Sequence, residues 1–180
     1  VHVTLHTALR NVFDQLSQEA VLAKSWLAHR FMSRVKGSPP RIAVCALNPH
    51  GGEGGLFGDE EQTLIRPAVE RGRAEGLDLD GPLPTDTLMV RARDGDCDAV
   101  VAMYHDQGLS PFKALSFSQG VNFTAGLPVI RTSPDHGTAY RLAGEDKASA
   151  ESMLAAIFMA CDIYRTRRRN QAITGGVHEG

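Results

Sequence analysis

Residues 97–107 read CDAVVAMYHDQ, an apolar run that passes directly into three polar side chains. Such a short apolar run is typical of a strand that is covered on both faces of a parallel sheet. Residues 41–47, RIAVCAL, repeat the pattern and lead into the glycine-rich stretch NPHGGEGGLFG. We therefore predict two buried strands whose exits carry polar side chains. In α/β sheets, ligands bind beyond the carboxyl ends of the strands, so these exits are the first place to look for a site.

Helical patterns flank the predicted strands. In residues 17–37, Ser17 suits the N-cap and Gly37 suits the position where the helix ends. Residues 59–76 begin with acids and end with arginines, as the helix dipole favours. Pro67 lies inside this second pattern and predicts a kink or a break there.

The rest of the chain adds elements of both kinds. Residues 1–5 read as extended, and residues 77–89 predict a turn-rich connector with a short helix that begins at Thr85. A closing helix is expected over residues 148–170, before a basic and then polar tail. Alternating strands and helices predict an α/β fold with a largely parallel sheet.

Composition excludes several classes of protein. With 180 residues, 42% of them apolar, the chain can form one domain or slightly more. The formal charge of −2 gives no electrostatic footprint for nucleic acid or an anionic membrane. No apolar run approaches the ~20 residues of a spanning helix. Cys45, Cys97 and Cys161 are far apart in apolar segments, which predicts reduced core thiols and a cytoplasmic setting.

Three histidines lie at strand exits or in glycine-rich loops, namely His6, His50 and His105. Neutral imidazole is a common ligand for zinc-like divalent ions, and three imidazoles leave one coordination position open. Each histidine taken singly suits a hydrogen-bonded structural role better, and the repeated placement makes a metal site about equally favoured. Three other histidines lack this context and are predicted at the surface: His2, His29 and His178.

Other polar residues near the strand exits also have two interpretations. Asp86 either caps a helix or belongs to a site. Asp106 either orients the neighbouring imidazole of His105 or acts on a substrate. Lys113, Asn122 and Arg131 would suit an anionic substrate, with the arginine binding bidentately, or they are simply solvated.

The glycine-rich stretch GGEGGLFG over residues 51–58 is not a nucleotide-binding loop. It lacks the lysine and hydroxyl residue that end a P-loop, and its glycines do not follow the G-x-G-x-x-G spacing. Glycines here favour a backbone that passes close to a ligand or around an ion.

Several long motifs together resemble the 4-hydroxythreonine-4-phosphate dehydrogenase family of the pyridoxal phosphate pathway. They are LNPHGGEGGLFGDEE, GPLPTDT, AMYHDQGL and GVNFTAGLPVIRTSPDHGTA, and the resemblance runs from VTLHTALR to the last helix. It implies an isocitrate/isopropylmalate dehydrogenase-like fold, a three-layer α/β/α arrangement with a mostly parallel sheet. That fold binds NAD without the G-x-G-x-x-G fingerprint.

The resemblance also implies roles for individual residues. The metal ligands would be His6, His50 and His105, which hold Zn, Mg, Mn or Co at a site completed across a homodimer interface. Substrate contacts would be Lys113, Asn122 and Arg131, and the catalytic groups Asp86, Asp106 and Lys113. NAD or NADP would lie along His136, Gly137, Thr138 and Ala139.

The implied reaction is NAD-dependent oxidation of 4-phosphooxy-threonine to a 2-amino-3-oxo acid, which decarboxylates to 3-amino-2-oxopropyl phosphate. A bound divalent cation would lower the pKa of the alcohol, and Asp106, or Lys113 through a water, would take the proton. Alternatives within the family are erythronate or threonate phosphate and aromatic cis-dihydrodiols as substrates. Alternatives of another class are a metal-dependent lyase and a non-catalytic dimerising fragment.

The resemblance finally implies that the chain is a C-terminal portion of a longer protein. Residues 1–147 would form the metal-, substrate- and dimer-forming domain. Residues 148–170 would be a closing helix that packs on a largely absent first domain, and residues 171–180 a frayed tail. We expect weak or no turnover from the 180-residue chain alone.

Overall fold

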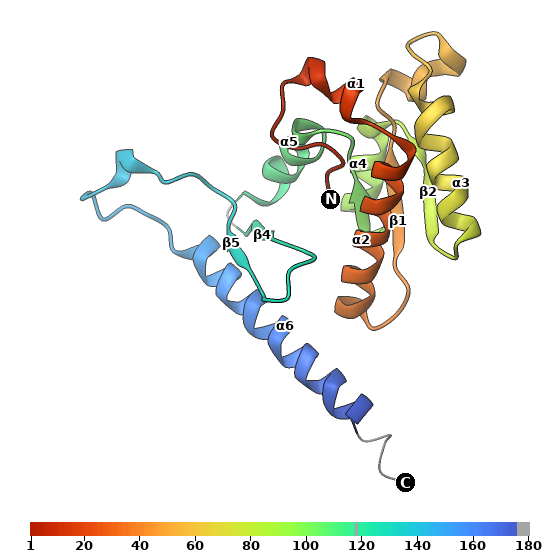
Figure 1. Cartoon of the computed structure of the whole chain (residues 1–180). Coiled ribbons are helices and arrows are strands. Elements are labelled where there is room, and N and C mark those ends of the chain that lie inside the picture. The colour runs from red at the N-terminus through yellow and green to blue at the C-terminus, as the bar shows by residue number, and fades with distance from the viewer. Residues whose placement is uncertain (118, 176–180) are drawn as a thin grey trace. The chain divides into compact units, whose positions relative to one another are not determined.

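The computed structural model describes residues 1–117 and 119–175 (Figure 1). The chain divides into two compact units, Val1–Pro111 and Phe112–Gly180. The first unit contains η1 (Leu9–Asn11), α1 (Val12–Gln15), α2 (Gln18–Lys36), β1 (Arg41–Cys45), η2 (Pro49–Gly55), η3 (Glu61–Ile65), α3 (Arg66–Ala74), β2 (Asp78–Leu83), α4 (Thr85–Arg93) and β3 (Ala99–Val101). Helix α5 (His105–Ser116) crosses the boundary, and β4 (Val121–Phe123), β5 (Thr132–Pro134), η4 (Tyr140–Leu142) and α6 (Glu151–Gly175) follow.

The first unit is built on a parallel sheet in the order β2-β1-β3. Strand β1 lies in the middle, with Ile42 opposite Leu79 of β2 and opposite Ala99 of β3. The first residues of the chain extend the sheet beyond β3, where the N–H of Val3 donates to the carbonyl of Ala102 at 2.8 Å. The extended start and the parallel sheet that the sequence predicts are therefore confirmed.

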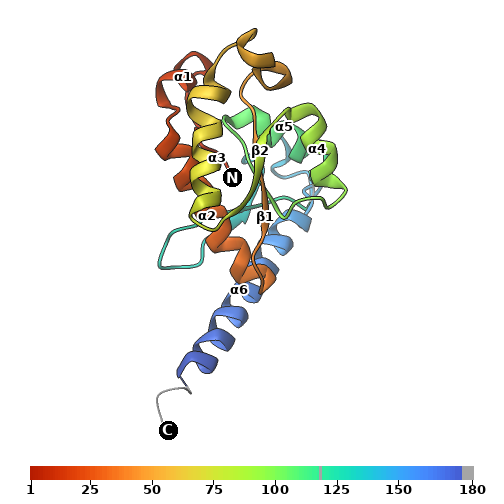
Figure 2. The same ribbon diagram turned by 90° about the vertical axis from the view of Figure 1, so that its right-hand side faces the viewer.

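Helices cover both faces of this sheet, which gives the three-layer α/β/α arrangement (Figure 2). Alternate residues of β1 point to opposite faces, as strand geometry requires. Ile42 and Val44 pack in the core beneath α2 and α3, whereas Ala43 and Cys45 pack with Leu88 of α4. Because all these residues are buried, β1 reads as a continuous apolar run in the sequence.

Local signals place the two long helices of the first unit as the sequence predicts. The Ser17 hydroxyl accepts from the N–H of Ala20, and Gly37 ends α2 with a φ of 76°. At Pro67 the helical backbone is continuous, so the expected break is absent: a π-helical turn, η3, passes into α3 at Arg66, and the proline occupies the second position of α3. There the missing N–H of proline costs no helical hydrogen bond.

The connector predicted over residues 77–89 is wrong in its first half, which forms the strand β2. Gly81 and Pro82 suggested a turn, because proline cannot donate to a sheet ladder. In the structure, the register of β2 against β1 shifts between Ala43 and Cys45, next to these residues, and β2 lies at the edge of the three-stranded sheet. An edge position and an irregular register are the settings in which a strand tolerates proline. The helix predicted from Thr85 is confirmed as α4.

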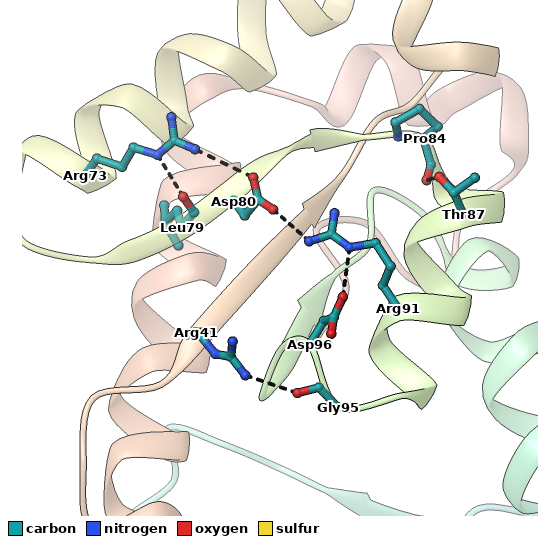
Figure 3. A network of polar contacts seen from close by, with 9 residues as sticks. All are labelled: Arg41, Arg73, Leu79, Asp80, Pro84, Thr87, Arg91, Gly95 and Asp96. Atoms are coloured by element: carbon teal, nitrogen blue, oxygen red, sulfur yellow. Dashed lines mark hydrogen bonds and ion pairs between the residues drawn. The ribbon is translucent and has the colours of Figure 1, made fainter.

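Alternating charges tie the amino ends of the strands to the neighbouring helices (Figure 3). Arg91 of α4 reaches Asp80 of β2 and Asp96, each at 3.2 Å. Arg73 of α3 donates to the carbonyl of Leu79 at 2.7 Å. These arginines are about half exposed, so each ion pair contributes little to stability. The network fixes the amino ends of the strands, at the end of the sheet opposite to the strand exits.

The second unit pairs β4 with β5 in antiparallel register and packs α6 against them. The Ser152 hydroxyl donates to the carbonyl of Gly120 at 3.1 Å, and the Thr132 hydroxyl donates to that of Ala156 at 2.9 Å. Helix α6 runs to Gly175, and residues 176–180 lie outside the described residues, as does His178. The functional division at residue 147 stays a prediction, since the compact units divide after Pro111.

Two sequence expectations about burial can be compared with the structure. Cys45 is buried and Cys97 is half-buried, but Cys161 is exposed on α6, so the prediction of a core thiol is wrong at that position. Helix α6 also leaves large apolar side chains exposed in this unit, among them Leu154, Ile157 and Phe158. Among the described residues, no helix is both long and apolar enough to span a bilayer.

Candidate active site

The carboxyl ends of all three strands in the first unit lie side by side at the same end of the sheet. The N–H of Ala46, just after β1, donates to the carbonyl of Leu83 at the end of β2 at 2.8 Å. The Gln107 side chain joins this point to the exit of β3 through its bond to the carbonyl of Ala46 at 2.6 Å. The loops that carry His50, Asp86 and His105 therefore start from one place, as parallel strands dictate.

The loop after β1 has an unusual backbone. Residues His50 to Gly54 all have positive φ values, from 42° at Glu53 to 79° at Gly52. L side chains rarely adopt this conformation, which explains the glycines in the stretch. At Gly52 there is also no room, because a Cβ atom would lie 2.7 Å from Oε2 of Glu61 and 2.9 Å from the carbonyl oxygen of Gly58. The glycines form a tight left-handed turn that presents the exposed His50.

A buried carboxylate anchors the start of that loop. Glu61 is 1% exposed, and its Oε1 accepts from the N–H groups of Leu47 and Asn48, both at 2.7 Å. Its Oε2 accepts from the Asn48 side-chain amide at 3.0 Å. These three N–H donors bond both carboxylate oxygens and so offset the cost of burying the group.

His105 and His6 approach each other beside an open cavity. Their ring centroids are 5.7 Å apart. Nδ1 of His105 lies 2.6 Å from Oδ1 of Asp106, and the acid itself is 79% exposed. The cavity, of about 470 Å³, is lined by Leu5, His6, Thr7, Ala8, Leu9, Val12, Tyr104, His105 and Asp106.

His2 belongs to the same cluster, which corrects its expected place at the surface. Its ring stacks on that of His105 with centroids 6.3 Å apart, and burial lowers the pKa of His2 to about 4. Nε2 of His2 is buried without a hydrogen-bond partner. His29 is also half-buried, edge-on to Trp26 with centroids 5.6 Å apart, so the surface prediction is wrong for it too.

One copy of the chain does not bring all three predicted metal ligands together. His50 lies beside Phe57, with ring centroids 6.4 Å apart. Within residues 1–117 and 119–175, no three His, Cys, Asp or Glu side chains are grouped so that they could hold a metal ion. The metal assignment of His6, His50 and His105 stays a prediction, with two of the three rings close to each other.

Asp86 lies in the first turn of α4 and is exposed. It is not the N-cap, a position that Pro84 occupies, but Oδ1 accepts from the N–H of Thr87 at 2.8 Å. A carboxylate in the first turn of a helix is favoured by the helix dipole. The structural role of Asp86 is therefore visible, and its predicted catalytic role stays a prediction.

The remaining predicted site residues lie in the second unit. Nζ of Lys113 is 3.9 Å from Oδ2 of Asp135, which makes no hydrogen bond. The Arg131 guanidinium donates to the Thr124 hydroxyl at 2.7 Å, and the exposed Asn122 lies on β4. The segment predicted to line the nicotinamide cofactor is exposed: His136, Gly137, Thr138 and Ala139.

Sequence reasoning missed two buried polar residues beneath the strand exits, Glu61 and Gln107. Glu61 stood among surface acids in a helical pattern, and Gln107 stood in a polar run with His105 and Asp106. A signal was present for Glu61, because it lies four residues before the buried Ile65, on the same face of the pattern. Gln107 had no comparable signal.

Comparison with known proteins finds relatives of similar sequence. The chain is 57% identical over 165 residues to a 4-hydroxythreonine-4-phosphate dehydrogenase of Geobacter metallireducens, which covers 92% of this chain and 49% of that protein. It is 51% identical over 163 residues to a D-threonate 4-phosphate dehydrogenase of Salmonella typhimurium, covering 91% and 50%. The chain thus spans about half the length of the curated relatives it matches.

The solved structures give the same result for the fold. The crystal structure of a 4-hydroxythreonine-4-phosphate dehydrogenase from Klebsiella pneumoniae superimposes with a TM-score of 0.81 at 52% identity, covering 90% of this chain and 49% of that one. The model of the family described as pyridoxal phosphate biosynthetic protein PdxA matches residues 1–160. With its fold, its motifs and this match in agreement, the chain belongs to the PdxA family.

Proposed function

We propose that the protein containing this chain is a NAD-dependent, divalent-metal-dependent dehydrogenase that oxidises 4-phosphooxy-threonine. The 2-amino-3-oxo acid formed then decarboxylates to 3-amino-2-oxopropyl phosphate, a step of pyridoxine 5'-phosphate biosynthesis. The observation that carries this proposal is the 57% identity, over 92% of the chain, to a relative named 4-hydroxythreonine-4-phosphate dehydrogenase.

Of the three imidazoles proposed as metal ligands, one chain brings only His6 and His105 close together. Zinc lies about 2 Å from an imidazole nitrogen, so the rings of two histidines on one tetrahedral ion have centroids roughly 5 Å apart. The separation of 5.7 Å between His6 and His105 is close to that value. His50 is not part of the pair, which fits a site completed by a second copy of the chain, as we propose for a homodimer.

Asp106 would orient one of these ligands. Because Oδ1 of Asp106 faces Nδ1 of His105, that nitrogen carries the proton and Nε2 is left as the donor to a metal. A divalent cation, when bound, would lower the pKa of the substrate hydroxyl and stabilise the enolate of the decarboxylation. The exposed oxygen of Asp106 would accept the hydroxyl proton, or Lys113 would do so through a water.

The second unit would supply the groups that bind the anionic substrate and the cofactor. Lys113 and Arg131 are cations, and Asn122 adds a neutral amide. Arg131 is already held through Thr124, which limits the rotamers it must lose on binding. The exposed segment from His136 to Ala139 would contact NAD or NADP. We propose a cytoplasmic location for the dimer.

A second candidate substrate is D-threonate 4-phosphate, favoured by the 51% identity to the Salmonella typhimurium relative. The two substrates differ at carbon 2, which carries an amine in one and a hydroxyl in the other. Asp86, one of the predicted site acids, would tell them apart, since a carboxylate binds an ammonium group more strongly than a hydroxyl.

The test is an assay of the full-length natural protein that contains this chain. Both substrates are supplied with NAD or NADP and Zn²⁺, Mg²⁺, Mn²⁺ or Co²⁺, and NADH formation is followed by absorbance. The proposal predicts turnover that stops when the metal is chelated. Product formed without any nicotinamide cofactor would instead indicate a lyase. The 180-residue chain alone should give weak or no turnover, and dimers that persist without metal or turnover would favour a dimerising fragment.

A further inference from the structure

Gln107 is a buried polar side chain to which the proposed reaction gives no part. It is 7% exposed and lies in the first turn of α5, two residues after His105. Its amide oxygen accepts from the N–H of Met103 at 2.6 Å. Its amide nitrogen donates to the carbonyl of Ala46 at 2.6 Å and to the hydroxyl of Thr85 at 2.8 Å.

These three bonds determine how the amide is oriented. The N–H of Met103 can only donate and the carbonyl of Ala46 can only accept, so a flipped amide would oppose like groups at both ends. The side chain uses both of its N–H donors and its one oxygen. An apolar side chain at this position would therefore leave the buried N–H of Met103 without its acceptor.

The three partners of Gln107 each lead to a residue of the candidate site. Met103 lies at the exit of β3, two residues before His105. Ala46 lies at the exit of β1, four residues before His50, and Thr85 is next to Asp86. The single amide thus joins the residues that follow β1, the start of α4 and the residues that follow β3.

Glu61 continues the same anchoring along the exit of β1. Gln107 holds the carbonyl of Ala46, and Glu61 holds the N–H groups of Leu47 and Asn48. Three successive residues are therefore fixed through their backbone by buried side chains. The left-handed turn begins at His50, after the intervening Pro49.

We propose that Gln107 is a positioning residue that fixes how each copy of the chain presents the His50 loop and the start of α5, and so how tightly a divalent metal shared between two copies is bound. The inference rests on the proposed function, because it takes His50 and His105 as metal ligands. Groups that orient metal ligands from behind typically affect metal affinity by about 10–100-fold. Gln107 would act through the backbone of both loops and would touch neither metal nor substrate.

The test uses Co²⁺, whose visible absorbance reports its coordination, titrated into the 180-residue chain. Gln107→Met keeps the length of the side chain and removes all three bonds, and we expect it to weaken Co²⁺ binding by about 10–100-fold. Val69→Ala is the matched control, because Val69 is a buried apolar residue of α3 that makes none of the side-chain hydrogen bonds at the strand exits, so its truncation lowers stability without removing those bonds.

Hydrogen–deuterium exchange provides a readout that needs no metal. Gln107→Met should speed exchange over residues 46–50 and 103–106 together. Val69→Ala should not speed exchange in these two segments more than in the rest of the first unit. If Gln107→Met does not fold, Thr85→Val replaces it. It leaves the bonds of Gln107 to Met103 and Ala46 in place and removes the two bonds of the Thr85 hydroxyl, with the Gln107 amide at 2.8 Å and with the carbonyl of Ala46 at 3.5 Å. Thr85→Val should give a smaller loss of Co²⁺ affinity in the same direction.

The outcomes separate this inference from the proposed function. If the unchanged chain binds Co²⁺ and Gln107→Met binds it as tightly, the positioning role is refuted and the metal site stands. Equal losses of Co²⁺ affinity in Gln107→Met and Val69→Ala would refute the positioning role as well, because general destabilisation would explain both. If the unchanged chain binds no Co²⁺, the proposed metal site fails, and the inference fails with it.

Discussion

Nδ1 of His105 lies 2.6 Å from Oδ1 of Asp106, the next residue in the chain. The two side chains leave the same turn of α5, and the acid is exposed while the imidazole is half-buried. A carboxylate on one ring nitrogen fixes the tautomer and makes the other nitrogen a better ligand. This pair is therefore the part of the candidate site that one chain already presents in a form suited to metal binding.

The first prediction follows from this pair. Asp106→Ala should weaken Co²⁺ binding by about 10–100-fold, because the imidazole of His105 loses its orienting partner. Asp106→Asn should have a smaller effect, since a neutral amide oxygen can still accept from Nδ1 but more weakly. The measurement is a Co²⁺ titration followed by absorbance.

Asp78→Ala is the control for Asp106. Asp78 is an exposed acid that begins β2, at the opposite end of the sheet from the strand exits. It removes the same charge, so a general electrostatic effect on Co²⁺ would appear in both variants. Equal affinities for Asp106→Ala and the unchanged chain would count against the pairing as a feature of the metal site.

The second prediction compares two neighbouring glycines in the loop of His50. Gly51 has a φ of 69° and open space where a Cβ would be, so Gly51→Ala should cost about 1–2 kcal/mol for the left-handed conformation alone. At Gly52 the new Cβ would also meet Glu61 and the backbone of Gly58, at 2.7 Å and 2.9 Å. Gly52→Ala should therefore cost roughly 2–5 kcal/mol. Urea unfolding of the two variants measures both values, and equal losses would contradict the packing argument.

The sequence predicts those parts of the fold that depend on local signals. Ser17 and Gly37 mark the ends of α2, and the apolar runs mark β1 and β3. Strand β2 was missed because Gly81 and Pro82 give a turn signal, while their tolerance in the sheet comes from an edge position that only the tertiary structure reveals. The local sequence pattern does not show which strand lies at the edge of the sheet.

The candidate site shows the same division. His6 and His105 were singled out by their places after extended segments, and their rings do approach each other. The burial of Gln107 could not be read from the sequence, because an amide in a polar run is usually solvated. For Glu61 the one signal was its spacing of four residues from Ile65, in a pattern where most acids are solvated. What makes them internal is the set of backbone groups at the strand exits that need partners.

The third prediction concerns Glu61. Glu61→Leu should lower the free energy of unfolding by roughly 2–4 kcal/mol, because the N–H groups of Leu47 and Asn48 lose the buried carboxylate oxygen that accepts from both of them. Glu60→Leu is the matched control, since the half-buried Glu60 accepts one bond, from the Asn48 side chain at 2.6 Å. Its loss should cost about 1 kcal/mol. Urea unfolding that ranks the two variants in the reverse order would refute the anchoring role.

The fourth prediction concerns pH and Cys45. Burial raises the pKa of the Cys45 thiol from 9.0 to about 11. Between these values the unfolded chain loses the proton and the folded chain keeps it, so the folded state binds more protons and its stability falls as pH rises through this window. The contribution is on the order of 2–3 kcal/mol, and it is fully present below pH ~9. Urea unfolding from pH 8 to 11 should show a shallower decline for Cys45→Ala than for the unchanged chain. Cys161→Ala, at an exposed thiol, should leave the decline as it is. Parallel curves for Cys45→Ala and the unchanged chain would mean that the thiol ionises equally well in the folded protein, and that the face of β1 towards α4 is open to water.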